Sequence, residues 1–246
     1  MPTPDLLFTI LSAVGSTNNY AMAKVHEGVA NYGQAYFCSN QTEGKGQRGK
    51  RWETATGLNI ALSIVLDVQM LKASQQFQLS VAVALGCYDF FAAFAGEETR
   101  IKWPNDIYWR DKKAGGILIE TIFSGQQWKY AVAGIGLNIN QTTFDIDLQN
   151  PVSLQQITGK SFNLELLARD LHQKVLLRYD NLLKGNFADL LQEYNQHLFG
   201  LDKISRLKKD TIVFDTTIVG VSEYGQLLTV DTMERQFNFG EVAWVL

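Results

Sequence analysis

Residues 41–52 read QTEGKGQRGKRW, a stretch that holds three glycines, four cationic side chains and a closing tryptophan within twelve positions. Glycine adopts backbone conformations that other residues avoid, so the N–H groups of such a loop can turn inward around a ligand. The cationic side chains add the charge that binds a phosphate or a carboxylate. The stretch predicts a clamp for a small anion; a mobile, solvated basic loop is the alternative that these residues alone leave open.

The composition places this loop in an ordinary globular chain. The 246 residues are 46% hydrophobic and 19% charged, with a net charge of −3, so the basicity is local. That balance argues against a general nucleic-acid binder. Residues 1–11 contain no basic leader, and the apolar run 81–95 is interrupted by Asp89 and is shorter than a membrane span. Cys38 and Cys87 show no metal spacing, so we expect a reduced, cytoplasmic protein away from membranes.

Residue patterns predict an α+β fold with a mixed β-sheet and flanking helices. A strict β-α-β alternation is absent, which excludes a doubly wound sheet. Helical patterns cover residues 19–29, 75–95, 164–183 and 187–198. Strand patterns cover residues 35–39, 58–66, 101–103, 116–123 and 128–140, with a hairpin turn at 124–126. We expect Ser16 or Thr17 to cap the first helix and Asn163 to cap the third.

After residue 200 the pattern changes to short β-like runs at 211–214, 217–221, 227–230 and 236–239. Turns at 224–225 and 233–234 separate them. These runs predict a small β-barrel, so we divide the chain into an α+β domain at 1–200 and a C-terminal domain at 201–246.

Residues 134–140 read GIGLNIN, in which side-chain size alternates with position. Successive side chains of a strand point to opposite faces. Ile135, Leu137 and Ile139 then face the core, and the opposite face is nearly bare. Interior glycines weaken a strand unless something approaches its backbone closely, so this face could accept a flat ligand. A bulge, or tight packing against a helix, is the alternative.

Two lysine-containing segments add positive charge near further glycines. Residues 102–106 read KWPND and follow a predicted strand, with Pro104 fixing φ and removing an N–H. Residues 112–116 read KKAGG and open the next strand. Taken singly, the lysines fit a solvated surface and Asp106 fits a turn cap. Together with the basic loop and the glycine strand, they favour an anion-binding floor.

These segments, in this order, resemble the catalytic domain of biotin–protein ligases over roughly residues 5–200. The matching pieces are Ser16-Thr17-Asn18, residues 41–52, residues 102–106, residues 113–120 and residues 134–138. The resemblance implies a fold related to class II aminoacyl-tRNA synthetases, with an SH3-like C-terminal barrel. It implies an ATP-dependent ligase that forms biotinyl-5'-AMP and transfers biotin to a lysine of a biotin carboxyl carrier protein, with ATP and Mg²⁺ required.

The resemblance also implies residue roles. Lys113 would hold the biotin carboxylate and then the acyl phosphate, and Asp106 would assist transfer to the carrier lysine. The implied biotin-binding residues are Ser16, Thr17, Asn18, Gln41, Gly44, Lys45, Gly46, Gln47, Trp52, Lys113, Gly116, Gly134 and Gly136. The implied ATP or phosphate contacts are Lys45, Arg48, Lys50, Lys102 and Asn138. No metal ligand is assigned.

Two positions depart from the family pattern. Gln47 stands where the family often has arginine, with Arg48 a candidate substitute, and Pro151 or Val152 stands where some members have an aromatic residue over adenine. A lipoate–protein ligase and a non-catalytic biotin sensor are the rival functions. The Ser-Thr-Asn piece begins at Ser16, so we expect no DNA-binding segment before it and no sequence-specific DNA binding. A homodimer through sheet edges is a further expectation from the family.

Overall fold

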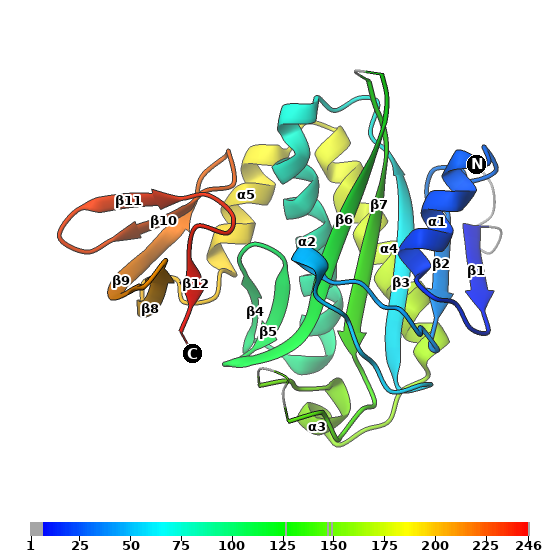
Figure 1. Ribbon diagram of the computed structural model, residues 1–246, viewed down its shortest axis with the longest axis horizontal. Coiled ribbons are helices and arrows are strands. Elements are labelled where there is room, and N and C mark those ends of the chain that lie inside the picture. The colour runs from blue at the N-terminus through cyan, green and yellow to red at the C-terminus, as the bar shows by residue number, and fades with distance from the viewer. Residues whose placement is uncertain (1–6, 126, 147, 149, 246) are drawn as a thin grey trace.

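The computed structural model describes residues 7–125, 127–146, 148 and 150–245 of the chain. Its larger sheet has seven strands in the order β1-β2-β3-β7-β6-β5-β4 (Figure 1). These strands are β1 (Phe8–Leu11), β2 (Ala35–Cys38), β3 (Asn59–Asp67), β4 (Thr99–Lys102), β5 (Asp106–Trp109), β6 (Lys112–Ser124) and β7 (Gln127–Asn138). The pair β1–β2 is parallel and the other neighbouring pairs are antiparallel. The sheet is therefore mixed, which confirms the predicted α+β class.

Helices cover both faces of this sheet. They are α1 (Thr17–His26), α2 (Gln76–Ala95), α3 (Leu154–Thr158), α4 (Leu164–Leu183) and α5 (Phe187–Gln196), with 3-10 turns η2 (Gln47–Gly49) and η3 (Ala73–Gln75). Alternate strand residues face opposite sides: Phe37 joins the core under α2 and α4, whereas Tyr36 packs with Ala21 of α1. Helix α1 thus lies on the face opposite α2 and α4 (Figure 1).

The helix boundaries follow their capping residues. The Ser16 side chain accepts a hydrogen bond from the Asn19 N–H and begins α1 at Thr17, two residues before the predicted start. The Asn163 side chain caps α4 through the Leu166 N–H, as predicted. Helices α2 and α4 approach closely at Gly86, where a β-carbon would lie 2.6 Å from the Val175 Cα. The short helix α3 was not predicted.

The core face of β7 confirms the alternation in residues 134–140. Ile135, Leu137 and Ile139 are buried in the core under the helices, and each such buried aliphatic side chain stabilises the fold by about 1.5–3 kcal/mol. Gly134 and Gly136 face the other side, where they pair in register with Ser63 and Ala61 of β3. This side of the central strands is lined by small side chains and leaves space above the sheet.

Helix α2 is longer than the apolar run considered at 81–95. Together with η3 it forms a helical segment over residues 73–95 that is long and apolar enough to cross a membrane by length and composition. More than half of its apolar window, 56%, is buried inside the protein. Core helices pass the same test, and α2 packs as a core helix against the sheet and α4 (Figure 1).

A second, antiparallel sheet follows α5 in the order β11-β10-β9-β8-β12. Its strands are β8 (Ile204–Lys209), β9 (Ile212–Val221), β10 (Leu227–Val230), β11 (Glu234–Phe237) and β12 (Ala243–Trp244). Among the described residues, no strand pair joins β11 to β12 to close a barrel. This sheet stands beside the β4–β5 end of the larger one (Figure 1).

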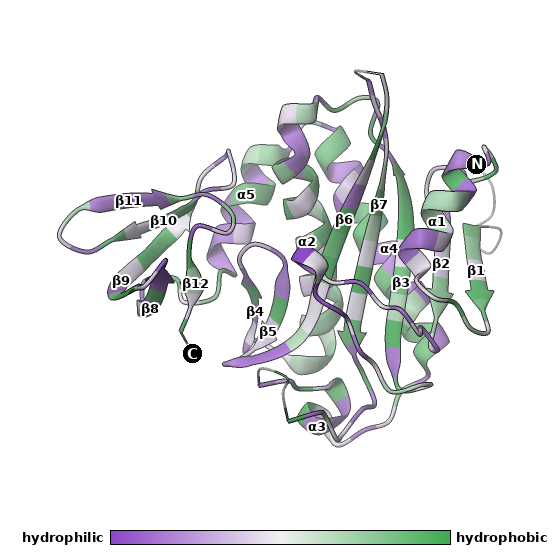
Figure 2. Cartoon of the chain, in the orientation of Figure 1, coloured by the Kyte–Doolittle hydropathy of each residue, from purple (hydrophilic) through white to green (hydrophobic). Residues whose placement is uncertain are grey.

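Several strand predictions differ from the structure. The runs 211–214 and 217–221 form one strand, β9, because Asp215 at the apparent break pairs with Arg206 of β8 across the ladder. Strand β8 was missed because it is hydrophilic along most of its length and buries only Leu207 (Figure 2). Strand β5 was missed for a different reason, since residues 106–109 directly follow the Pro104 turn. The predicted turn at 124–126 includes Gln126, which lies outside the described residues.

Candidate active site

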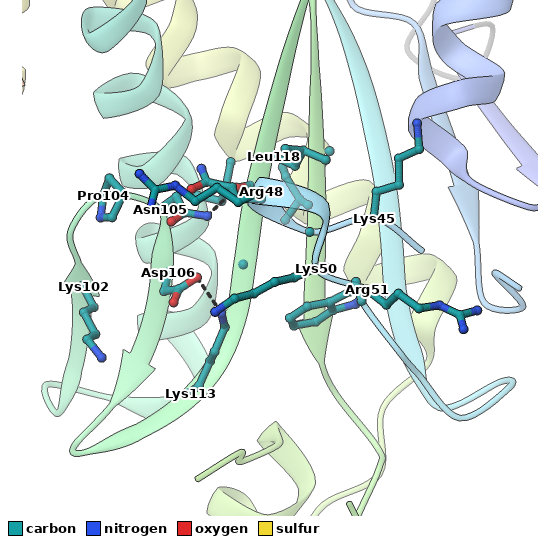
Figure 3. Close-up of a pocket in the computed structure, with 18 of the residues that line it drawn as sticks. Lys45, Arg48, Lys50, Arg51, Lys102, Pro104, Asn105, Asp106, Lys113 and Leu118 are labelled. Atoms are coloured by element: carbon teal, nitrogen blue, oxygen red, sulfur yellow. Dashed lines mark hydrogen bonds and ion pairs between the residues drawn. The ribbon is translucent and has the colours of Figure 1, made fainter. Parts of the chain in front are cut away.

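Residues from distant parts of the chain surround one cavity of about 320 Å³ on the small-residue side of the sheet (Figure 3). Its walls come from the start of α1, the glycine loop, the segment after β4, strands β6 and β7, and the end of the chain. All of the predicted site residues except Gly44 and Asn138 line it: Ser16, Thr17, Asn18, Gln41, Lys45, Gly46, Gln47, Arg48, Lys50, Trp52, Lys102, Asp106, Lys113, Gly116, Gly134 and Gly136. These residues lie far apart in the sequence, and the fold brings them to one cavity.

Gly44 and Asn138 have structural surroundings that explain their absence from the wall. A β-carbon on Gly44 would collide with the carbonyl oxygen of Trp52, and the two residues are joined by a Trp52 N–H to Gly44 O hydrogen bond of 2.9 Å. The Asn138 amide donates to the carbonyl oxygens of Val152 and Lys113, at 3.2 and 3.4 Å. Gly44 therefore joins the two ends of the glycine loop through its hydrogen bond to Trp52. Asn138 links strand β7 to Lys113 and Val152.

Trp52 occupies the bare face of the glycine strand. A β-carbon on Gly136 would collide with its indole ring, and one on Gly116 would lie 3.5 Å from the ring. The indole Nε1 is buried and has no hydrogen-bond partner among the described residues. The two glycines thus admit the flat side chain of Trp52, which walls the cavity. Gly134 admits a different group, because its β-carbon would collide with the Asn18 amide.

Lys113 and Asp106 form an ion pair inside the cavity. Their Nζ and Oδ1 atoms are 2.7 Å apart, and the two side chains are 30% and 21% exposed (Figure 3). The β5–β6 hairpin produces this contact, since it pairs Asp106 with Gly116 and brings Lys113 alongside. A lysine held this way presents an ammonium group that an incoming anion can share or take over.

The loop cations differ in how firmly they are held. Lys45 Nζ donates to Asn19 Oδ1 at 2.6 Å, Arg48 Nη2 donates to Phe239 O at 3.3 Å, and Arg51 lies 3.9 Å from Glu53. Lys50 has no side-chain hydrogen bond or ion pair within the described part of the chain. Lys50 is therefore the loop cation most available to a phosphate.

Lys102 lies at one edge of the cavity in a buried, aromatic setting. Its Nζ donates to the Tyr108 hydroxyl at 3.0 Å and lies 5.5 Å from the Trp244 ring centroid. Burial lowers the Lys102 pKa to about 8, opposed by the charge of Asp106. Figure 3 shows its side chain directed away from the Asp106–Lys113 pair. A phosphate contact, as the sequence predicts for Lys102, requires the ammonium to leave this position.

A hydrogen-bond network beneath the cavity contains two residues that the sequence analysis missed, Ser63 and Glu120. Ser63 Oγ lies 2.6 Å from Asn18 Oδ1, and Asn18 Nδ2 donates to Glu120 Oε2 at 2.8 Å. Strand parity offered a signal for both. Glu120 shares the face of β6 with Gly116, and Ser63 pairs directly with Gly134. A polar side chain in an apolar strand, on the same face as the glycines, indicates a hydrogen-bond partner above that face.

The C-terminal residues Phe239, Gly240, Val242, Ala243 and Trp244 also line the cavity. The sequence predicts an appended domain in this region and no site residue within it. Its glycine between aromatic residues, in FNFGEVAW at 237–244, was the available signal. Pro151 and Val152, considered as replacements for an adenine cover, do not line the cavity; Val152 is buried in the core.

Comparison with known proteins agrees with this geometry. A model of the Biotin/lipoate A/B protein ligase family matches residues 11–138. The Biotin--[acetyl-CoA-carboxylase] ligase of Paracoccus denitrificans is 34% identical over 170 residues, which cover 65% of this chain and 69% of that protein. The Bifunctional ligase/repressor BirA of Escherichia coli is 25% identical over 241 residues, which cover 95% of this chain and 73% of that protein.

A solved structure shares the fold over nearly the whole chain. The biotin protein ligase from Aquifex aeolicus in complex with biotin and ATP has a TM-score of 0.80 and 22% identity, and the match covers 97% of this chain and 98% of that one. The family match spans more than half of the sequence and includes the glycine loop, Asp106, Lys113 and the glycine strand. The chain belongs to the biotin/lipoate A/B protein ligase family.

Proposed function

We propose that the chain is an ATP-dependent biotin–protein ligase, which activates biotin as biotinyl-5'-AMP and transfers it to a lysine of a biotin carboxyl carrier protein, a subunit of acetyl-CoA carboxylase or a related enzyme. One observation carries the proposal: a polar ring-binding end, a tryptophan wall and the Lys113–Asp106 pair share one cavity. The names of the relatives support the same activity.

The polar end of the cavity suits the ureido ring of biotin. Ser16 and Thr17 are buried at the start of α1, and Gln41 contacts Thr17 through two hydrogen-bond distances of 2.9 and 3.1 Å. A ureido group carries both N–H donors and a carbonyl acceptor, so it needs partners of both kinds. We therefore place the ureido ring of biotin at Thr17 and Gln41, with its valerate chain passing Trp52 toward Lys113.

In the first step, a carboxylate oxygen of biotin attacks the α-phosphorus of ATP, and the bond to the bridging oxygen breaks to release pyrophosphate. Two anions must approach each other, so charge repulsion is a large part of the barrier. The Lys113 ammonium offsets this repulsion at the carboxylate, and Lys50 offsets it at the phosphates. Holding both substrates in line supplies further rate enhancement, at best about 7–11 kcal/mol in well-positioned systems.

Mg²⁺ would enter with the nucleotide rather than in a protein cage. Among the described residues, no group of three or more His, Cys, Asp or Glu side chains could hold a metal ion. Mg²⁺ is commonly bound through one or two carboxylates plus substrate phosphates, and Asp106 is a carboxylate within the cavity. When bound, the ion would neutralise phosphate charge.

In the second step, the amine of the carrier lysine attacks the acyl carbon, and AMP leaves with the electron pair of the broken C–O bond. The attacking lysine must first lose a proton, because free lysine is mostly protonated at neutral pH. In this proposal Asp106 accepts that proton, or orients the amine, once Lys113 turns to the acyl phosphate. The 2.7 Å pair therefore serves both steps: Lys113 binds the anion and Asp106 handles the amine.

The two rival functions are distinguishable in this cavity. Lipoate has an apolar dithiolane ring and needs no donor and acceptor set, so the network at Thr17 and Gln41 favours biotin. A non-catalytic sensor would bind biotin without turnover, and it remains a rival because Gln47 replaces a common arginine. Lys113 and Asp106, paired within the cavity, favour the enzyme.

Incubating the purified chain with biotin, MgATP and a biotin carboxyl carrier domain tests the proposal. We expect mass spectrometry to show one biotinyl group on one carrier lysine, with release of pyrophosphate. Lipoate in place of biotin serves as the matched substrate control. Tight biotin binding without carrier labelling would support the sensor, and labelling by lipoate alone would support the lipoate ligase.

The setting of the reaction follows from the same proposal. We propose a cytoplasmic setting, because both Cys38 and Cys87 are free and buried, as a reducing compartment allows. A homodimer through sheet edges stays a prediction, and the β1 edge, where Ile10 is 49% exposed, is our candidate for it. Analytical ultracentrifugation with and without biotin tests it.

A further inference from the structure

Four side chains form a continuous hydrogen-bonded line under the cavity. It runs from Glu120 on β6 through Asn18 on α1 and Ser63 on β3 to Thr17 on α1. Neighbouring atoms along this line are 2.8, 2.6 and 2.8 Å apart. Asn18, Ser63 and Thr17 are at most 4% exposed, so bulk water does not reach them and they must hydrogen-bond to one another.

The orientation of the Asn18 amide is determined by its acceptors. Its nitrogen faces the Glu120 carboxylate at 2.8 Å and the Leu118 carbonyl oxygen at 3.3 Å. A carbonyl oxygen and an ionised carboxylate accept hydrogen bonds and cannot donate them. The Asn18 NH₂ group must therefore point to β6, which leaves the Asn18 carbonyl oxygen facing Ser63.

The Ser63 hydroxyl has one proton and two oxygen neighbours. Asn18 Oδ1 carries no proton, so the Ser63 proton must lie on the 2.6 Å contact to Asn18. The 2.8 Å contact to Thr17 then needs the proton of the Thr17 hydroxyl. The competing acceptor of that proton, Gln41 Oε1, is farther away at 3.1 Å and already accepts the Thr17 backbone N–H at 2.9 Å. The Thr17 proton therefore lies on the shorter contact to Ser63, whose oxygen has no other donor in the described structure.

Thr17 and Gln41, which both line the cavity, then offer complementary groups. The Thr17 hydroxyl donates its hydrogen bond to Ser63, so toward a ligand it can only accept one. The Gln41 carbonyl oxygen is held by Thr17, so its NH₂ group is turned away from Thr17, and no described residue accepts a hydrogen bond from it. One acceptor and one donor match a ring with an N–H beside a C=O.

We propose that Glu120 is a positioning residue that sets the direction of this line of hydrogen bonds and thereby makes Thr17 an acceptor for a ring N–H. The inference rests on the proposed function, because it concerns selection of the ureido ring. It assigns Asn18 to the relay between Glu120 and Ser63, since both of its polar atoms are already engaged by the protein. Ser63 is the second positioning residue.

Substituting Glu120→Gln tests the direction. A glutamine offers an NH₂ group as well as a carbonyl oxygen, so unlike the carboxylate it does not force the Asn18 NH₂ group to face β6. Where the Asn18 amide turns over, the hydrogen bonds along the line reverse, and the Thr17 proton is free to be donated to a ligand. The probes are biotin and its two cyclic carbamate isomers, in which an oxygen replaces one ureido N–H. We expect wild type to bind one isomer much more weakly than biotin, because its ring oxygen meets the Thr17 lone pair.

Calorimetric titration of each ligand supplies the readout without catalysis. In Glu120→Gln, biotin affinity should fall about tenfold, and the preference for biotin over the disfavoured isomer should fall about tenfold or more, as expected for one reversed hydrogen bond. Affinity for ATP should not change. Ser63→Ala interrupts the line without adding a donor, and should reduce the same preference to an intermediate value.

Glu98→Gln is the matched control, because it removes a surface carboxylate that lies 3.7 Å from Arg110. It should leave both affinities unchanged. Thermal unfolding reports whether each variant folds. A Glu120→Gln or Ser63→Ala variant that folds, binds biotin and keeps the wild-type preference overturns the inference while the ligase proposal stands. Failure of the wild-type chain to bind biotin at all would overturn both.

Discussion

Arg48 of the glycine loop lies against Phe239 near the C-terminus, with its guanidinium carbon 4.6 Å from the ring centroid. Its Nη2 donates to the Phe239 carbonyl oxygen at 3.3 Å. The next residue, Gly240, has φ of +86°, and a β-carbon there would collide with the guanidinium. Arg48 itself has φ of +55°, a conformation that arginine rarely adopts. The C-terminal segment and the loop conformation therefore depend on each other.

We expect Phe239→Ala to loosen the glycine loop. A partly exposed cation–π contact contributes about 0.5–1 kcal/mol, so the open loop should become about two- to fivefold more populated. Limited proteolysis should show cleavage within residues 44–51 accelerated by that factor, and biotin should slow it in both proteins.

Arg51→Ala is the matched control, because this loop arginine is 68% exposed and has no contact with the C-terminal segment in the described structure. It removes a loop cation without touching the contact between Arg48 and Phe239, and should not speed cleavage at the remaining loop sites. Equal cleavage of wild type and Phe239→Ala would show that the contact does not hold the loop.

Lys113→Ala should abolish most of the adenylation activity and leave the fold intact. Removing one preorganised group at a developing charge lowers rates by about 10²–10³-fold. The ion pair with Asp106 is partly exposed, so its loss should cost at most about 1 kcal/mol of stability. Pyrophosphate release measures the first effect and thermal unfolding measures the second.

Asp106→Asn separates the two half-reactions. It keeps the size of the side chain, and it should slow transfer to the carrier more than pyrophosphate release, because the amine loses its carboxylate. Single-turnover transfer from preformed biotinyl-5'-AMP measures this directly. Wild-type adenylation in Lys113→Ala, or unchanged transfer in Asp106→Asn, would contradict the assigned roles.

Lys102 provides a pH-dependent test. Its folded pKa of about 8 lies below the ordinary value of 10.5 because burial disfavours the ammonium. The folded protein then binds fewer protons than the unfolded chain between these pH values, so stability rises with pH across that window. Below pH 8 the full cost of burying the charge is present.

Lys102→Met removes that cost. The variant should be more stable than wild type at pH 7, by about 1–3 kcal/mol, and its advantage should shrink as pH rises above 8. Denaturant unfolding at pH 6.5–9.5 measures the difference. A pH-independent difference would mean that Lys102 does not titrate in this range. The Michaelis constant for ATP in the same variant tests the phosphate contact, which stays a prediction.

Local patterns predicted what depends on neighbouring residues. The alternation of Ile135, Leu137 and Ile139 sufficed to identify the core face of β7, because strand periodicity is a property of adjacent positions. Strand β8 escaped because most of its residues are hydrophilic and exposed, and only Leu207 reaches the core. The site residues named from the resemblance mostly line the cavity, since the matching motifs carry them.

Patterns of neighbouring residues could not predict which group packs against each glycine. The bare face of β7 correctly indicated a close approach, but the approaching groups are Asn18 and Trp52, which come from other parts of the chain. Glu120 and Ser63 act through Asn18, so their importance appears only when three strands and a helix are assembled. Tertiary partners, rather than propensities, decide these positions.

The Trp52–Gly136 contact gives a final prediction that uses two variants together. Gly136→Ala places a methyl group where the indole lies, so the ring must move away from the strand and no longer walls the cavity. Trp52→Ala removes the wall directly, and either change should weaken biotin binding by about ten- to a hundredfold, as expected when a buried aromatic contact of about 1.5–3 kcal/mol is lost. Because both act through one contact, the double variant should be little worse than Trp52→Ala alone, whereas independent sites would add their effects. Calorimetric titration of biotin into the four proteins measures the coupling, and full additivity would show that the indole does not rest on Gly136 when biotin binds.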